Sequence, residues 1–165
     1  MTTFAEELIE EFGEKVIALA QHLGLETDLD ETEFQISENE EFEDEEEKQE
    51  RLQELADERH DKIEEIKDEL NSIVNEYDNT YSYGREEYIV ATDEEADEIE
   101  DEYLDNYLEE CIYPELPENL RFYFDDEAWK RDARMDGRGH CISTYDGCEY
   151  EEKVNGTWYY IYRTN

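Results

Sequence analysis

Basic side chains are scarce in this sequence, which has 14 Lys and Arg residues against 53 Asp and Glu in a chain of 165. The formal net charge at pH 7 is −39, far outside the range of ordinary globular domains. Nucleic acids and anionic membrane surfaces are bound through Lys and Arg, so the composition argues against both as direct ligands. It favours a protein that presents negative charge to a positively charged partner.

Long hydrophobic runs and a secretion signal are also missing. No apolar run approaches the length of a membrane span, and residues 1–7 carry acids where a signal peptide carries basic residues. The cysteines Cys111, Cys141 and Cys148 fit no disulfide framework, and His140 beside Cys141 makes a poor zinc pattern. We therefore expect a cytoplasmic protein with reduced thiols and with neither a metal nor an organic cofactor.

The chain nevertheless has the composition of a folded protein. Hydrophobic residues make up 37% of it and aromatic residues 13%, which is more than disordered acidic chains contain. Its length allows one domain, or a compact domain with a helical extension. The element pattern predicts an α+β fold, with an acidic helical region over residues 1–78 and a small α+β domain over residues 79–165 that ends in a β-hairpin.

Two helices are predicted in the N-terminal region. The first covers residues 3–22, where apolar residues recur every three or four positions up to a stop at Gly24. Residues 26–47 contain no Lys or Arg and form a loop or the start of the next helix. The second helix covers residues 43–77 and has a coiled-coil-like seam, which packs on the first helix or on a second copy in a homodimer. The seam consists of Leu52, Ala56, Arg59, Ile63, Ile66, Leu70, Ile73 and Tyr77.

The C-terminal region alternates strands and helices. After a turn over residues 79–85, a strand covers residues 86–91, and Thr92 with Glu95 forms a capping box for a helix that ends before Pro114. We expect the buried face of that helix to consist of Ala96, Ile99, Tyr103, Tyr107 and Cys111.

Two further elements complete this region. Asp125 or Asp126 caps a helix that continues to about residue 135. A hairpin then joins residues 150–154 and 157–162 through an Asn155-Gly156 turn of type I′.

The acidic helix faces are the main candidate for a functional surface. Carboxylates three or four positions apart on a helix lie roughly 5 to 6 Å from each other, comparable with neighbouring phosphates of a nucleic-acid strand. Ordinary acidic helices intersperse lysines, whereas residues 16–47 and 86–120 contain no Lys or Arg. The candidate partner-binding residues are Glu40, Glu41, Glu43, Asp44, Glu45, Glu46, Glu47, Glu94, Asp97, Glu98, Asp101, Glu102, Asp105 and Glu109.

Adaptation to high salt and enzymatic activity account less well for these acids. A salt-adapted protein would spread its acids evenly and favour Asp as well, whereas Glu dominates here and occurs in blocks. Carboxylate pairs are too abundant to indicate an active site. Residues 136–141, Asp-Gly-Arg-Gly-His-Cys, are the most site-like motif, but they lack a phosphate-binding fingerprint. We expect a structural loop there and no enzymatic activity.

Residues 116–132, Leu-Pro-Glu-Asn-Leu-Arg-Phe-Tyr-Phe-Asp-Asp-Glu-Ala-Trp-Lys-Arg-Asp, resemble the C-terminal part of ArdA-type antirestriction proteins. Those proteins have a similar Pro-Glu-x-Leu, Tyr-Phe-Asp-x-Glu and Arg-Asp arrangement and end in an aromatic strand near Tyr-Ile-Tyr-Arg. The resemblance covers about the last third of the chain, and the helices up to about residue 77 match nothing in that pattern. It implies mimicry of DNA that blocks a host restriction enzyme.

A second resemblance concerns residues 88–98, 136–140 and 145–147, which are similar to small uncharacterised proteins of tailed phages. Together the two resemblances suggest a phage or plasmid protein that works in the cytoplasm of a bacterial host. The leading hypothesis is an inhibitor of a defence nuclease, either a restriction–modification complex or a CRISPR effector, that binds a basic DNA channel through acidic helix faces. The alternative is an acidic adaptor or chaperone for a basic phage or host protein.

Overall fold

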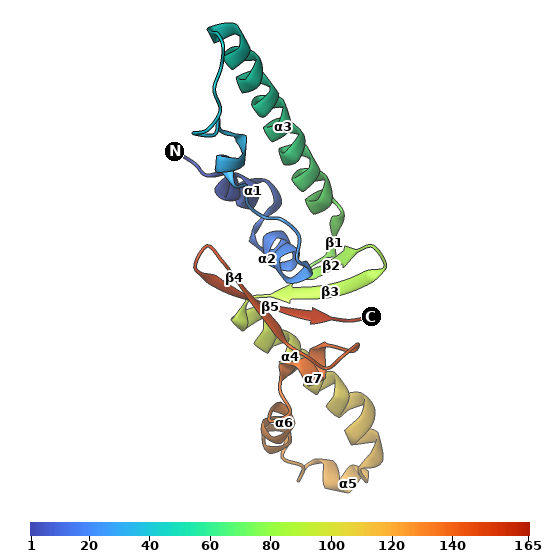
Figure 1. The fold of residues 1–165 in the computed structure, drawn as a ribbon. Coiled ribbons are helices and arrows are strands. Elements are labelled where there is room, and N and C mark those ends of the chain that lie inside the picture. Colours follow the sequence, from blue (N-terminus) through green and yellow to red (C-terminus); the bar gives the residue numbers. More distant parts are fainter. The chain divides into compact units, whose positions relative to one another are not determined.

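The computed structural model describes residues 1–165, which form two compact units, Met1–Ile73 and Val74–Asn165. The first unit is helical, and the second combines an antiparallel sheet with helices (Figure 1). The α+β class predicted from the sequence is therefore confirmed.

The first unit begins with two helices, α1 (Phe4–Phe12) and α2 (Glu14–Leu23), where the sequence predicted one continuous helix. Thr3 and Glu6 form a capping box at the start of α1. Gly13 separates the two helices with φ at 89°, a conformation that only glycine adopts at little cost. The prediction of a single helix is therefore wrong at Gly13, and the expected stop at Gly24 is confirmed.

The long helix α3 (Glu45–Asn71) starts close to the predicted position and ends before the predicted one. The residues that follow form strand β1 (Ile73–Tyr77), which pairs with β2. Ile73, Val74 and Tyr77 favour a strand, and this preference outweighs the predicted helical spacing, which continues through Ile73 and Tyr77.

The predicted seam of α3 is only partly correct. Ile66 and Leu70 are buried as expected, but Leu52 is 39% exposed and Ala56 is also exposed. Leu55, which was not assigned to the seam, is 2% exposed instead. The buried side of the helix therefore shifts by one position at its N-terminal half, because the local packing partners decide which residue is covered.

Basic residues of α3 hold the acidic segment between α2 and α3, which includes the short 3-10 helix η1 (Glu31–Phe34). A further lysine of α3 pairs with α1. The ion pairs are Arg51–Glu40 (3.1 Å), Arg59–Glu31 (2.7 Å), Lys62–Glu26 (2.7 Å) and Lys67–Glu11 (2.8 Å). Arg59, the polar interruption of the predicted seam, thus binds an acid of this segment. These four cations of α3 neutralise acids of their own unit.

The sheet of the second unit has the order β1-β2-β3-β5-β4. Its strands are β2 (Thr80–Tyr83), β3 (Glu86–Ala91), β4 (Tyr150–Val154) and β5 (Thr157–Arg163), together with β1. β3 and β5 are antiparallel, with Ala91 opposite Tyr160. Asn155 and Gly156 both have positive φ, at 50° and 82°, as a type I′ turn requires, so the predicted hairpin is confirmed.

The helices of this unit lie on one side of the sheet (Figure 1). They are α4 (Asp93–Tyr107), which continues into a π-helical turn (Leu108–Ile112) and a 3-10 turn (Tyr113–Glu115), then α5 (Glu118–Arg121), α6 (Asp126–Arg134) and α7 (Arg138–Ile142). The capping box of Thr92 with Glu95 and the cap at Asp125 are both confirmed.

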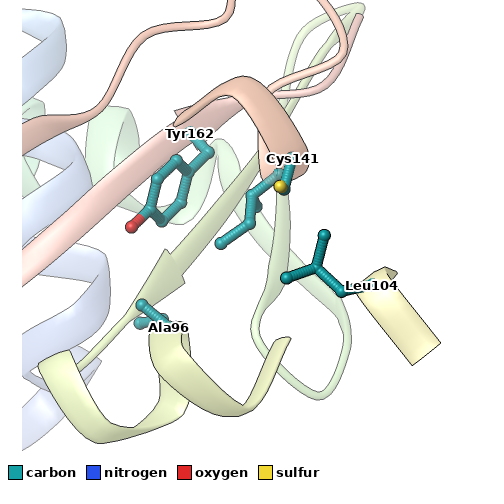
Figure 2. Packing of buried hydrophobic residues seen from close by; sticks show 6 residues of the cluster. Ala96, Leu104, Cys141 and Tyr162 are labelled. Carbon is teal, nitrogen blue, oxygen red and sulfur yellow. The ribbon is translucent and has the colours of Figure 1, made fainter. Parts of the chain in front are cut away.

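A compact core joins these helices to the sheet. Figure 2 shows Ala96 and Leu104 of α4, Cys141 of α7 and Tyr162 of β5 pointing into one shared space. Ala91 and Ile142 complete the cluster. These side chains fix the position of α4, the most acidic helix of the unit.

The buried face of α4 differs from the predicted one. The buried residues are Ala96, Glu100 and Leu104, whereas Tyr103 and Tyr107 are 42% and 40% exposed. Cys111 is exposed as well. The sheet and α7 cover a row of residues spaced by four, and the two tyrosines lie beside this row. Both tyrosine rings consequently remain partly exposed.

Candidate functional site

Helix α4 carries two neighbouring rows of carboxylates, each with a spacing of four residues. One row consists of Asp97, Asp101 and Asp105, and the other of Glu94, Glu98 and Glu102. All six were predicted to contact a partner. The structure gives the two rows different surroundings.

The aspartate row is neutralised from within the molecule by bases of α6 and α7. Lys130 contacts Asp101 at 3.2 Å and also pairs with Asp105, and Arg134 pairs with Asp101 as well. The Lys130 side chain is only 8% exposed, and its hydrogen bonds to Asp105 and Asp101 raise its pKa although burial opposes this. The aspartates therefore attach α6 to α4.

The glutamate row has no such partners. Glu94, Glu98 and Glu102 are exposed, and none of them forms an ion pair or a side-chain hydrogen bond. Glu109, which follows in the π-helical turn, is exposed and unpaired in the same way. These four carboxylates are available to a partner.

A shallow groove of about 600 Å³ runs along this side of α4. Its lining is acidic apart from a single base and consists of Asp97, Glu98, Glu100, Asp101, Glu102, Asp105 and Arg134. The groove thus brings two free glutamates, Glu98 and Glu102, together with the paired aspartates.

Glu100 is an unusual member of this lining. It is 4% exposed, and its Oε1 atom has no hydrogen-bond partner. Removal from water raises the pKa of this carboxyl, because the charged form is poorly solvated there. The sequence gives no sign of this residue, since one glutamate among many in an acidic helix looks like a surface residue.

In the first unit, the predicted contact residues surround the start of α3. Asp44 caps this helix by accepting a hydrogen bond from the Glu47 N–H at 2.9 Å, and Glu47 in turn accepts one from the Glu43 N–H at 2.7 Å. Glu40 is paired with Arg51. Local structure therefore accounts for part of this acidic block.

Four carboxylates of the block remain without partners. Glu41, Glu43, Glu45 and Glu46 are exposed, and their carboxylates form no ion pair or hydrogen bond. Glu45 and Glu46 lie in the first turn of α3, where the helix dipole favours negative charge.

Most of the motif over residues 136–141 forms the short helix α7 (Arg138–Ile142) rather than the expected loop. Arg138 contacts Asp93 at 2.8 Å and Glu149 at 2.8 Å and lies 4.5 Å above the Tyr160 ring, so this arginine attaches α7 to neighbouring elements. Burial raises the pKa of the Cys141 thiol, which is the opposite of what an activated nucleophile needs. The motif is structural.

The cysteines at 111, 141 and 148 are free, and no group of three or more side chains is arranged to hold a metal ion. No helix combines the length and the apolar character that crossing a membrane requires.

The model of one protein family, described as antirestriction protein (ArdA), matches residues 24–146, well over half of the chain. The chain belongs to the ArdA antirestriction family. The match to ArdA includes the free carboxylates of both α3 and α4. The matched range differs from the extent of the ArdA resemblance expected from the sequence, because the match starts before η1 and stops before the terminal hairpin.

Neither a curated protein nor a solved structure matches the chain. The similarity to small proteins of tailed phages therefore stays a prediction.

Proposed function

We propose that this ArdA family protein is a phage- or plasmid-encoded inhibitor of a restriction enzyme that acts as a decoy for DNA. The free carboxylates of α4, and separately those at the start of α3, occupy basic sites that otherwise bind phosphates. The protein acts by binding, without catalysis. The family match supports antirestriction activity, and type I restriction enzymes are the expected target class.

The difference between the two carboxylate rows of α4 carries this proposal. A surface whose acids served only the fold would pair them with bases, as the aspartate row does. The glutamate row lies beside it without any cation. Consecutive members of that row are separated by about 6 Å along the helix axis, so a rigid helix presents evenly spaced negative charges.

Acids at unfavourable positions support the same conclusion. Asp68 and Glu69 lie in the last turn of α3, and Glu109 and Glu110 follow the end of α4, where the helix dipole disfavours negative charge. Neither α3 nor α4 has a basic residue in its last turn. Carboxylates that oppose local stability are expected where a partner needs them.

The electrostatics also suit a decoy. A net charge of −39 produces a long-range field that attracts a basic DNA channel and accelerates association. The Debye length is about 10 Å at 0.1 M salt, so this attraction weakens as salt rises.

A cleavage assay with a purified type I restriction enzyme and its DNA substrate tests the proposal. We expect inhibition that reaches completion at a fixed molar ratio of inhibitor to enzyme, because each molecule occupies one binding channel. Bound DNA and this protein should exclude each other. Cleavage that proceeds in the presence of excess protein would contradict the inhibitory function. A stable ternary complex with DNA would contradict mimicry and favour the adaptor alternative.

A further inference from the structure

A cavity of about 370 Å³ lies between α4, α6 and α7, apart from the glutamate row. Three aromatic side chains line it, with Tyr103 and Tyr107 from α4 and Trp129 from α6. Two carboxylates, Asp132 and Asp136, are also part of the lining. Leu104, Ala133, His140 and Cys141 complete it. The cavity therefore combines aromatic surface with negative charge.

The three rings form a continuous surface. Tyr107 and Trp129 are stacked, with ring centroids 5.7 Å apart and planes inclined by 9°. Tyr103 continues this surface at 6.3 Å from Tyr107. The faces of aromatic rings carry partial negative charge and attract cations, most strongly in the case of Trp.

Neither carboxylate of the cavity is neutralised. Asp132 and Asp136 are exposed, and neither forms an ion pair or a side-chain hydrogen bond. Lys130 and Arg134, which neighbour Asp132 in the same helix, are paired with aspartates of α4. The lining of the cavity thus has two acids and neither a lysine nor an arginine.

The same unit shows what such an environment binds. Arg138 lies 4.5 Å above the Tyr160 ring and contacts two aspartates and Glu149. Arg163 lies 3.8 Å above the Tyr145 ring and contacts Glu86 at 3.2 Å. Both arginines occupy a site made from a ring face and carboxylates. The cavity repeats these components without a resident arginine.

We propose that this cavity binds an arginine side chain of the inhibited protein. The planar guanidinium stacks on the Tyr107 and Trp129 surface while its N–H groups donate to Asp132 and Asp136. The proposal rests on the proposed function, which supplies a basic partner, and it adds a contact that phosphate mimicry does not include. A nucleic acid is a poor occupant because the two carboxylates repel its phosphates.

A peptide titration tests the chemistry of the cavity by itself. The chain has two tryptophans, so Trp158→Phe leaves Trp129 as the only indole reporter. We expect the peptide acetyl-Gly-Arg-Gly-amide to change the Trp129 fluorescence in a saturable way. The same peptide with citrulline, a neutral isostere of arginine, should bind at least about tenfold more weakly, because it loses both the cation–π and the charge-assisted contacts. Equal responses to the two peptides would overturn the proposal.

An inhibition assay with the full chain tests whether the partner uses the cavity. Asp132→Asn with Asp136→Asn should weaken inhibition about tenfold. The matched control is Glu115→Gln with Glu151→Gln, which removes the same charge at exposed, unpaired positions of the same unit. Tyr103→Leu provides a second variant, which removes one ring but keeps an apolar side chain.

The outcomes separate the two proposals. If the wild type fails to inhibit the restriction enzyme, the proposed function is wrong, and the peptide titration still decides the chemistry of the cavity. If the wild type inhibits and the cavity variants equal the charge-matched control, the function stands and the cavity proposal is wrong. If the cavity variants inhibit more weakly than the charge-matched control and keep the wild-type melting temperature, both the proposed function and the cavity proposal are supported.

Discussion

The two carboxylate rows of α4 permit a comparison of two variants that remove the same charge from the same helix. One is Glu94→Gln, Glu98→Gln and Glu102→Gln, and the other is Asp97→Asn, Asp101→Asn and Asp105→Asn. Each variant lowers the magnitude of the net charge by the same amount, so long-range steering changes equally. Any difference between them reports what the individual rows contact.

The aspartate variant should lose stability. Lys130, whose side chain is 8% exposed, loses both of its carboxylate partners. Breaking a fully buried ion pair costs about 3–5 kcal/mol, but Asp101 and Asp105 are 46% and 53% exposed, so we expect about 2 kcal/mol. Arg138 keeps Asp93 and Glu149, so the loss of Asp97 adds less than about 1 kcal/mol. For a unit of this size, the melting temperature should fall by roughly 10–20 °C.

The glutamate variant should keep its stability and lose binding. No ion pair is broken, and the weaker repulsion offsets the loss of a favourable charge in the first helical turn. Each carboxylate that faces the partner contributes about 1 kcal/mol, so affinity for the restriction enzyme should fall roughly a hundredfold. Calorimetry and a binding assay below the melting transition measure both quantities. Wild-type affinity in this variant, or an equal loss in both variants at temperatures where both are folded, would refute the assignment of the rows.

Three further changes test the packing. Gly139→Ala should destabilise the second unit by about 1–3 kcal/mol in urea unfolding, because the new Cβ would lie 2.6 Å from the Gly147 carbonyl oxygen. A variant as stable as the wild type would contradict this close approach. Ile66→Asp should lower the free energy of unfolding by several kcal/mol, since Ile66 is 1% exposed, and Ile63→Asp should lower it less because Ile63 is half-buried. Equal urea midpoints for the two variants would refute the assignment of the buried face of α3. Glu100→Gln should stabilise the protein at pH 7 by on the order of 1 kcal/mol and flatten its pH profile. The pKa of Glu100 is raised in the folded state, so the wild type should lose stability as pH rises from the ordinary carboxyl pKa of 4.5 through the pKa of the folded protein. If the stabilities of the wild type and the variant change in parallel from pH 4 to 7.5, Glu100 does not cause this loss.

Several elements were predicted correctly because the interactions that form them involve residues only a few positions apart. Thr92 and Glu95 satisfy each other's backbone N–H groups wherever the rest of the chain goes, so this helix start was readable. The Asn155-Gly156 turn is set by the backbone conformations that these two residues tolerate. The same local reasoning overlooked the break at Gly13, since a regular hydrophobic spacing continues across it.

The net charge could also be determined from the sequence without the structure. The surplus of acids and the segments without basic residues were enough to predict a positively charged partner, because net charge does not depend on packing. The motif near residue 120 indicated the ArdA family, and the family match confirmed it over a longer span.

Only the tertiary structure decided which carboxylates are free. Asp101 and Glu102 are neighbours with the same charge, and no local rule distinguishes them. Asp101 meets Lys130, which lies far away along the chain, whereas Glu102 meets no base. The burial of Glu100 and the exposure of Tyr107 arise in the same way, because the sheet and α7 together cover one face of α4. Pairing and burial depend on contacts between distant residues, and these are specified by the packed fold rather than by spacing along one helix.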